Sequence, residues 1–301
     1  ILLTGCETIR FYRQAVAGQG RLLLDRATVE SLMAAQETDP VLRYRLRLAR
    51  DVIAFGGAVG LPGAEAYGSY VETGRRFLVW NVFAAPALEL SLKTSCFPVA
   101  GCVSYRGYFN RKDAERQATL LRQQGYDVHV GGVTAYSTLG WFDDPLLDTF
   151  LFLDEEYLAA LLFHELAHRI VYVKGDTRFN ESLATSVEQV VLRDWLITRG
   201  DQARFERYLA SESRRQSVLG LINETRGQLR ELYSSDSAEI DKLRRKSELI
   251  GQLVENYGIL AAQWAESDEF SYWMSGEINN AKLETIADYN SRVPVMSAAL
   301  H

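Results

Sequence analysis

Cysteine and histidine are both scarce in this chain of 301 residues, which has three cysteines and four histidines. Three cysteines are too few for a fold held together by disulfides. Positive charge is not in excess either, since 33 Lys and Arg oppose 39 Asp and Glu for a net charge of −6, so the chain lacks the electrostatic pattern of a nucleic-acid-binding protein. No apolar run approaches the roughly 20 residues of a membrane-spanning helix.

The composition that remains is that of an ordinary folded protein. Hydrophobic residues make up 47% of the chain and charged residues 24%. These values exclude a disordered or collagen-like chain. The length is sufficient for one large domain or two small ones with a sizeable core.

The first six residues resemble the end of a bacterial lipoprotein signal. Leu3-Thr4-Gly5-Cys6 is similar to a lipobox, in which the cysteine is lipidated after cleavage before it. We therefore expect residues 1–6 to be the remainder of a signal peptide and Cys6 to carry the lipid. The expected location is the bacterial cell envelope, facing the periplasm and anchored to a membrane by the N-terminus. A chance match at a buried N-terminus is the alternative.

The other two cysteines lie close together in the sequence. Five residues separate Cys96 from Cys102, and they include Pro98 and Gly101, which favour a turn. An exported protein can form disulfides, so a short Cys96–Cys102 bridge is one interpretation. The other is a pair of small buried hydrophobic residues.

Three regions differ in their sequence patterns. Residues from about 7 to 75 indicate helices, and those from about 201 to 301 again indicate helices. Between them, strand signals come before further helices. In the last region, charged periodic segments at 205–232 and 240–257 flank the turn Ser234–Ser237, which predicts an αα-hairpin.

The strand signals lie between residues 76 and 150. Residues 77–83 are rich in β-forming side chains, 88–92 alternate apolar with polar, and 126–130 form another short run. An amphipathic helix is expected over 111–124, and residues 131–142 form an extended segment that ends in a loop. The mixture predicts a small antiparallel sheet and an α+β, mainly helical fold class.

Two of the four histidines lie in the motif His164-Glu165-Leu166-Ala167-His168, which is H-E-x-x-H. The preceding run, Leu158–Phe163, is apolar without Gly or Pro, and the acidic residues at 154–156 suit the start of a helix. At about 100° per residue, the two histidines lie one turn apart and about 40° apart around such a helix.

This geometry predicts a metal site. Both imidazoles can reach one ion at about 2.0–2.1 Å. Glu165 flanks the ion, where a general base for a metal-activated water belongs. Two histidines and a glutamate in an apolar helix are costly unless they are paired. The alternative is a hydrogen-bonded polar cluster without an ion.

A catalytic zinc takes three protein ligands and keeps one position open. Position 174 is Lys, so no third histidine follows at the spacing of the extended motif. Glu181 follows a loop and lies near the start of a second helix, which Asp176 or Thr177 can cap. It reaches the ion if the first helix extends about one helical turn past His168. Glu188, seven residues on, is the alternative ligand, or else a hydrogen-bond partner of one histidine.

Together with Phe179-Asn180-Glu181-Ser182-Leu183-Ala184, the H-E-x-x-H motif resembles the gluzincin metallopeptidases, in which an Asn-Glu-x-x-Ala helix supplies the third zinc ligand. The whole chain is similar to a family of bacterial aminopeptidases, on the lipobox-like start and on segments 96–102, 105–109, 135–141 and 293–294. It departs from the zinc aminopeptidases in having only 12 residues between His168 and Glu181 and no Gly-x-Met-Glu-Asn segment.

The resemblance implies zinc-dependent hydrolysis of peptides, with one Zn²⁺ per chain and Glu165 as general base. It also implies that the sheet packs on a gluzincin-like zinc helix pair, with residues 7–301 as a single catalytic unit. Tyr136 is the expected donor to the oxyanion, with Tyr105 and His129 as alternatives. The expected partners are a peptide substrate and, through the lipid anchor, a membrane.

Three other functions remain open on the sequence. The chain is a zinc endopeptidase if its cleft is open at both ends, whereas an aminopeptidase closes one end and binds the substrate amine with an acidic group. A zinc-containing lipoprotein without activity would bind metal and cleave nothing. A binding protein that used the helical hairpin as its surface would be indifferent to chelators.

Overall fold

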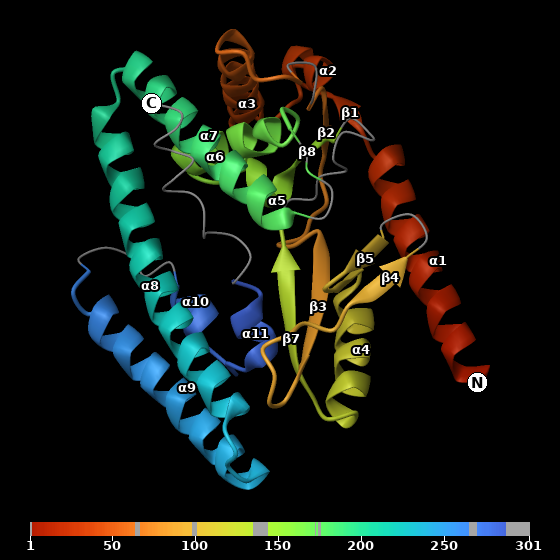
Figure 1. Cartoon of the computed structure of the whole chain (residues 1–301). Helices are drawn as coiled ribbons and strands as arrows, with labels where there is room; N and C mark the ends of the chain where they lie inside the picture. The colour runs from red at the N-terminus through yellow and green to blue at the C-terminus, as the bar shows by residue number, and fades with distance from the viewer. Residues whose placement is uncertain are drawn as a thin grey trace. The chain divides into compact units, whose positions relative to one another are not determined.

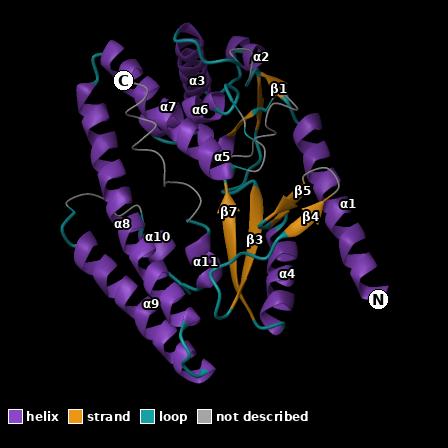
Figure 2. Ribbon diagram, in the orientation of Figure 1, coloured by secondary structure: helices purple, strands orange, loops and turns teal. Residues whose placement is uncertain are grey.

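The computed structural model of the chain describes residues 2–63, 67–97, 101–134, 144–171, 173, 176–264 and 270–286. These residues form two compact units: the first holds those of 1–79 and 132–209, the second those of 80–131 and 210–287. The fold is mainly helical with small sheets, which confirms the α+β class (Figures 1 and 2). The single catalytic unit stays a prediction.

Helices make up most of the first unit, and residues 7–75 are mainly helical as expected, apart from two short strands at 27–28 and 69–71. The helices are α1 (Leu2–Leu24), α2 (Val29–Ala34), α3 (Pro40–Ala58), α5 (Asp148–Leu151), α6 (Glu155–Ala167), α7 (Thr177–Thr198) and the start of α8 (Gln202–Ser234). The start of α3 follows from its sequence, because Pro40 is the first helical residue and the Asp39 side chain accepts hydrogen bonds from the amides of Val41 and Leu42.

The first unit also contains a three-stranded sheet. Its strands are β1 (Ala27–Thr28), β2 (Ser69–Val71) and β8 (Leu146–Leu147), in the order β1-β2-β8. β2 pairs antiparallel with β1 but parallel with β8, so the prediction of an antiparallel sheet is wrong for this pair. A parallel pair needs a long crossover connection, and the chain supplies one between residues 71 and 146.

The sheet of the second unit has the order β6-β3-β7 and is accompanied by the helix α4 (Arg111–Gln123). The strands are β3 (Val79–Pro86), β6 (Arg106–Tyr108) and β7 (Tyr126–Val133), and β3 pairs antiparallel with β6. The strand expected over 88–92 is not formed. The carbonyls of Pro86, Ala87 and Glu89 instead accept hydrogen bonds from the side chain of Asn280.

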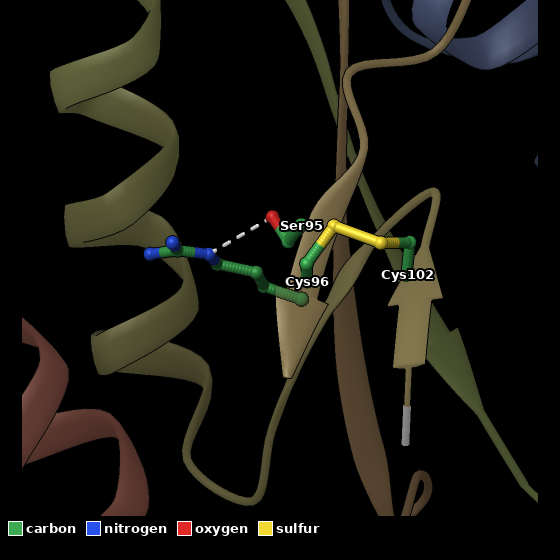
Figure 3. The surroundings of a disulfide bond; sticks show 4 residues. Ser95, Cys96 and Cys102 are labelled. Carbon is green, nitrogen blue, oxygen red and sulfur yellow. Dashed lines mark hydrogen bonds between the residues drawn. A yellow bond between two sulfur atoms is a disulfide. The ribbon is translucent and has the colours of Figure 1, made fainter. Parts of the chain in front are cut away.

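A two-stranded hairpin carries the paired cysteines. β4 (Ser95–Phe97) pairs antiparallel with β5 (Gly101–Val103), and this register places Cys96 opposite Cys102. The two are joined by a disulfide, and beside it the Arg106 guanidinium donates to the Ser95 hydroxyl at 3.2 Å (Figure 3). The structure therefore has the short bridge and not two buried thiols.

The predicted αα-hairpin is formed by α8 and α9 (Glu239–Ala261), followed by α10 (Ser271–Met274) and α11 (Asn280–Glu284). Its seam is a buried apolar cluster to which α8 contributes Val218, Ile222 and Leu229, and α9 contributes Leu249, Leu253 and Tyr257. Among the described helices, none is both long enough and apolar enough to cross a membrane.

Candidate metal centre

Helix α6 is apolar on nearly all sides because other helices pack around it. Phe163 lies between Phe55 of α3 and Trp195 of α7, with ring centroids 6.2 and 6.4 Å away. The helix ends at Ala167, and His168 is its C-cap. The expectation that α6 runs a turn past His168 is therefore wrong: the amides of Arg169 and Ile170 bond carbonyls only three residues back and close a tight turn.

The start of α7 is fixed by two polar side chains. Asp176 caps the helix by accepting from the Phe179 amide at 2.9 Å, as expected. Asn180 is 2% exposed, accepts from the Val173 amide at 2.8 Å and donates to the Val173 carbonyl at 2.9 Å. Asn180 thus holds the connection from α6 against α7 and places the next residue, Glu181, beside α6.

The three predicted metal ligands come together between these two helices. One ligand atom from each of His164, His168 and Glu181 lies within 4.8 Å of the others. Glu181 Oε2 is 3.2 Å from His164 Nε2 and 3.7 Å from His168 Nε2. The two imidazole rings are 4.8 Å apart and nearly perpendicular.

The alternative ligand, Glu188, contacts a histidine from the other side. Its Oε2 lies 3.0 Å from His164 Nδ1, and its Oε1 accepts a hydrogen bond from the Tyr208 hydroxyl at 2.8 Å. His164 therefore has a carboxylate at each ring nitrogen. This is the arrangement expected if Glu181 is a ligand and Glu188 is a hydrogen-bond partner of His164.

The carboxylates dominate the electrostatics around His164. Burial lowers the pKa of His164, but hydrogen bonds to Glu181 and Glu188 outweigh it and raise that pKa to about 10. Burial raises the pKa of Glu181, yet its hydrogen bonds to His164 and His168 prevail and lower it to about 2. Without a metal, one proton on His164 thus takes the place of a cation between the carboxylates.

Glu165 lies beside this cluster without joining it. Its Oε2 atom is buried and has no hydrogen-bond partner among the described residues. Burial raises its pKa, and the negative charges of Glu181 and Asp144 add to that effect, while His164 and His168 oppose it. An unpartnered buried carboxylate oxygen costs stability, so packing alone does not account for this position.

The donor set fits a zinc ion. Two imidazole nitrogens and one carboxylate oxygen are ordinary zinc ligands, and bonds of about 2.0–2.1 Å in a tetrahedron space the ligand atoms about 3.3 Å apart. The distances of 3.2 and 3.7 Å from Glu181 to the two histidines are close to that spacing. Nδ1 of His168 is buried and unpartnered within the described part of the chain.

The other predicted site residues lie either outside the described residues or in the second unit. Tyr136 lies outside the described residues, as does the side chain of Cys6. Tyr105 and His129 belong to the second unit, where both rings lie near Phe83, at 5.6 and 6.3 Å. Burial, reinforced by Lys282 and Arg122, lowers the pKa of His129 to about 4.

Two tyrosines near the centre were missed by the sequence analysis. Tyr208 is 20 residues from Glu188, on the next helix, and no motif marks it. Tyr67 is buried with a φ of +61° and lies within electrostatic range of Glu165. A non-glycine residue in that conformation is uncommon and often marks a functional site. The sequence predicts neither the contact of Tyr208 with Glu188 nor the backbone conformation of Tyr67.

Comparison with known proteins shows the family to which the chain belongs. The sequence model of the family described as "Putative aminopeptidase" matches residues 10–301, a range that includes H-E-x-x-H and Glu181. No curated protein and no solved structure matches the chain.

Proposed function

Because the chain belongs to this aminopeptidase family, we propose that it is a zinc-dependent peptide hydrolase that removes N-terminal residues. The observation that carries the zinc dependence is the approach of His164, His168 and Glu181, whose ligand atoms lie within 4.8 Å of one another. These three residues would hold the ion.

When bound, zinc lowers the pKa of a coordinated water and polarises the scissile carbonyl. Glu165 accepts the proton of the attacking water and passes it to the leaving amine. Its raised pKa suits this exchange, because burial makes the Glu165 carboxylate a stronger base for the proton of the water. Because Oε2 has no partner among the residues that the structure describes, it is available to bond the water.

Glu188 and a hydrogen-bond donor complete the proposed machinery. Glu188 accepts from His164 Nδ1 and so leaves Nε2 of that ring with its lone pair for the ion. A hydroxyl that donates to the developing oxyanion is the remaining requirement. Tyr136 stays our proposal for it, and Tyr67 is a second candidate because it lies within electrostatic range of Glu165.

The proposal is tested by peptide hydrolysis with Glu165→Gln as the decisive variant. Glutamine keeps the size of the side chain but cannot accept the proton, so kcat is expected to fall by about 10²–10⁴-fold. The zinc content should equal that of the wild type, because Glu165 is not one of the three ligands. Glu224→Gln, on an exposed position of α8 in the second unit, is the matched control and should keep full activity. Full activity in Glu165→Gln would overturn the mechanism.

The substrates separate exopeptidase from endopeptidase. We expect cleavage of peptides with a free N-terminus and none of the same peptides with an acetylated N-terminus. Equal cleavage of both would replace the aminopeptidase with an endopeptidase. Zinc bound without cleavage of either would leave a metal-containing protein without hydrolase activity.

A further inference from the structure

Tyr208 connects a third helix to the metal centre. Its hydroxyl donates to Glu188 Oε1 at 2.8 Å, and Glu188 Oε2 lies 3.0 Å from His164 Nδ1. The opposite nitrogen of the same ring, Nε2, faces Glu181 at 3.2 Å. The result is one continuous line of hydrogen bonds from α8 through α7 to a proposed ligand on α6.

Tyr208 is built into this position. Tyr208 is 2% exposed, and its ring contacts that of Tyr157 on α6 at 6.3 Å between centroids. One turn earlier on α8, Arg204 forms ion pairs with Glu155 at 3.2 Å and Glu156 at 3.3 Å, both on the first turn of α6. These contacts hold the start of α8 against α6, in the position that brings the Tyr208 hydroxyl to Glu188.

Glu188 needs such a partner. Its side chain is 14% exposed, and a carboxylate with one oxygen on His164 would rotate if the other oxygen lacked a donor. The Tyr208 hydroxyl occupies that second oxygen and fixes the plane of the carboxylate. A fixed carboxylate in turn fixes which His164 nitrogen carries hydrogen and how the ring points.

We propose that Tyr208 is a positioning residue for the metal, and that it acts through Glu188 to hold His164 ready to bind zinc. The inference rests on the zinc site of the proposed function. Outer-shell partners of zinc ligands typically change metal affinity by about 10–100-fold, so Tyr208→Phe is expected to weaken zinc binding by roughly 10-fold. Coupling is reciprocal, so bound zinc should also order the start of α8.

The first experiment compares Tyr208→Phe with Tyr233→Phe in zinc affinity, measured by competition with a chromogenic chelator. Tyr233 lies on the same helix, and its hydroxyl donates to Asn280 at 2.8 Å. Tyr233→Phe therefore also removes one tyrosine hydrogen bond from α8, but not the bond to Glu188. Tyr208→Phe should lose about 10-fold in affinity. Tyr233→Phe should equal the wild type. Equal affinity of all three proteins would overturn the proposal.

A double-mutant cycle with Glu188→Gln separates positioning from general loss of stability. If Tyr208 acts only through Glu188, adding Tyr208→Phe to Glu188→Gln should cost little further zinc affinity, because Glu188→Gln has already interrupted the line of hydrogen bonds to His164. Fully additive losses would contradict the proposal. Substitution with Co²⁺ supplies a second readout: the visible bands should shift in Tyr208→Phe and stay unchanged in Tyr233→Phe.

Hydrogen exchange of the wild type keeps the test open even if Tyr208→Phe does not fold. With zinc, amides of residues 203–209 should exchange more slowly, along with those near His164 and Glu181. Slower exchange in α6 and α7 but none in 203–209 would overturn the role of Tyr208. A wild type that binds no zinc would instead remove the proposed function itself.

Discussion

At the scale of single residues, the polar side chains on α6 differ in their hydrogen-bond partners. His164 has a carboxylate at each ring nitrogen, at 3.2 and 3.0 Å, whereas Glu165 Oε2 has no partner in the described part of the chain. The first arrangement stabilises the fold and the second weakens it. The H-E-x-x-H motif is enough to predict His164 and Glu165 as site residues. Tyr208 could not be predicted, because the contact depends on how α8 packs.

His129 supplies a prediction about pH. Its pKa in the folded protein is lowered from 6.5 to about 4, with burial as the main cause, so the unfolded chain binds a proton more readily than the folded one. Folding stability is therefore unaffected above pH 6.5 and decreases as the pH falls from 6.5 to about 4, by up to roughly 3 kcal/mol.

His129→Phe removes this titration and keeps an aromatic ring beside Phe83, whose centroid is 6.3 Å away in the wild type. Urea unfolding between pH 7 and pH 4, followed for the second unit, should show a flatter pH dependence in the variant. Identical slopes for variant and wild type would contradict the origin of the effect in His129.

At the scale of elements, the connection between α6 and α7 sets the reach of Glu181. In the described part of the connection, Ile170, Val171 and Val173 are 45%, 46% and 42% exposed, so burial of these three residues does not hold it. The two hydrogen bonds between Asn180 and the Val173 backbone take that role. The sequence predicted a cap at Asp176 or Thr177 because capping is local, and Asp176 provides it. It could not predict where α6 ends or which groups Asn180 bonds.

Asn180→Ala should therefore loosen the connection and weaken zinc binding. We expect a loss of about 1–2 kcal/mol in stability from the missing hydrogen bonds, and a lower zinc affinity because Glu181 is then less well placed. Thermal unfolding and chelator competition measure the two effects. Asn110→Ala, which removes a helix cap on α4 in the second unit, is the control for a loss of stability alone. An unchanged zinc affinity in Asn180→Ala would exclude this role of the side chain.

At the scale of the whole molecule, sequence patterns predicted the helices better than the sheets. The αα-hairpin and α4 follow from periodicity, which is a local property. The parallel pairing of β2 with β8 joins residues 75 or more positions apart, and the sequence holds no signal for it. The strand expected over 88–92 is displaced by hydrogen bonds from Asn280, which lies nearly 200 residues further along the chain.

The central claim is that His164, His168 and Glu181 hold one zinc ion, and elemental analysis of the purified protein tests it most directly. The protein is prepared without chelator, beside His164→Ala as control. The account predicts about one zinc per chain in the wild type and close to none in the variant, because two remaining ligands do not retain the ion. No zinc in the wild type, even after zinc is added, would contradict it.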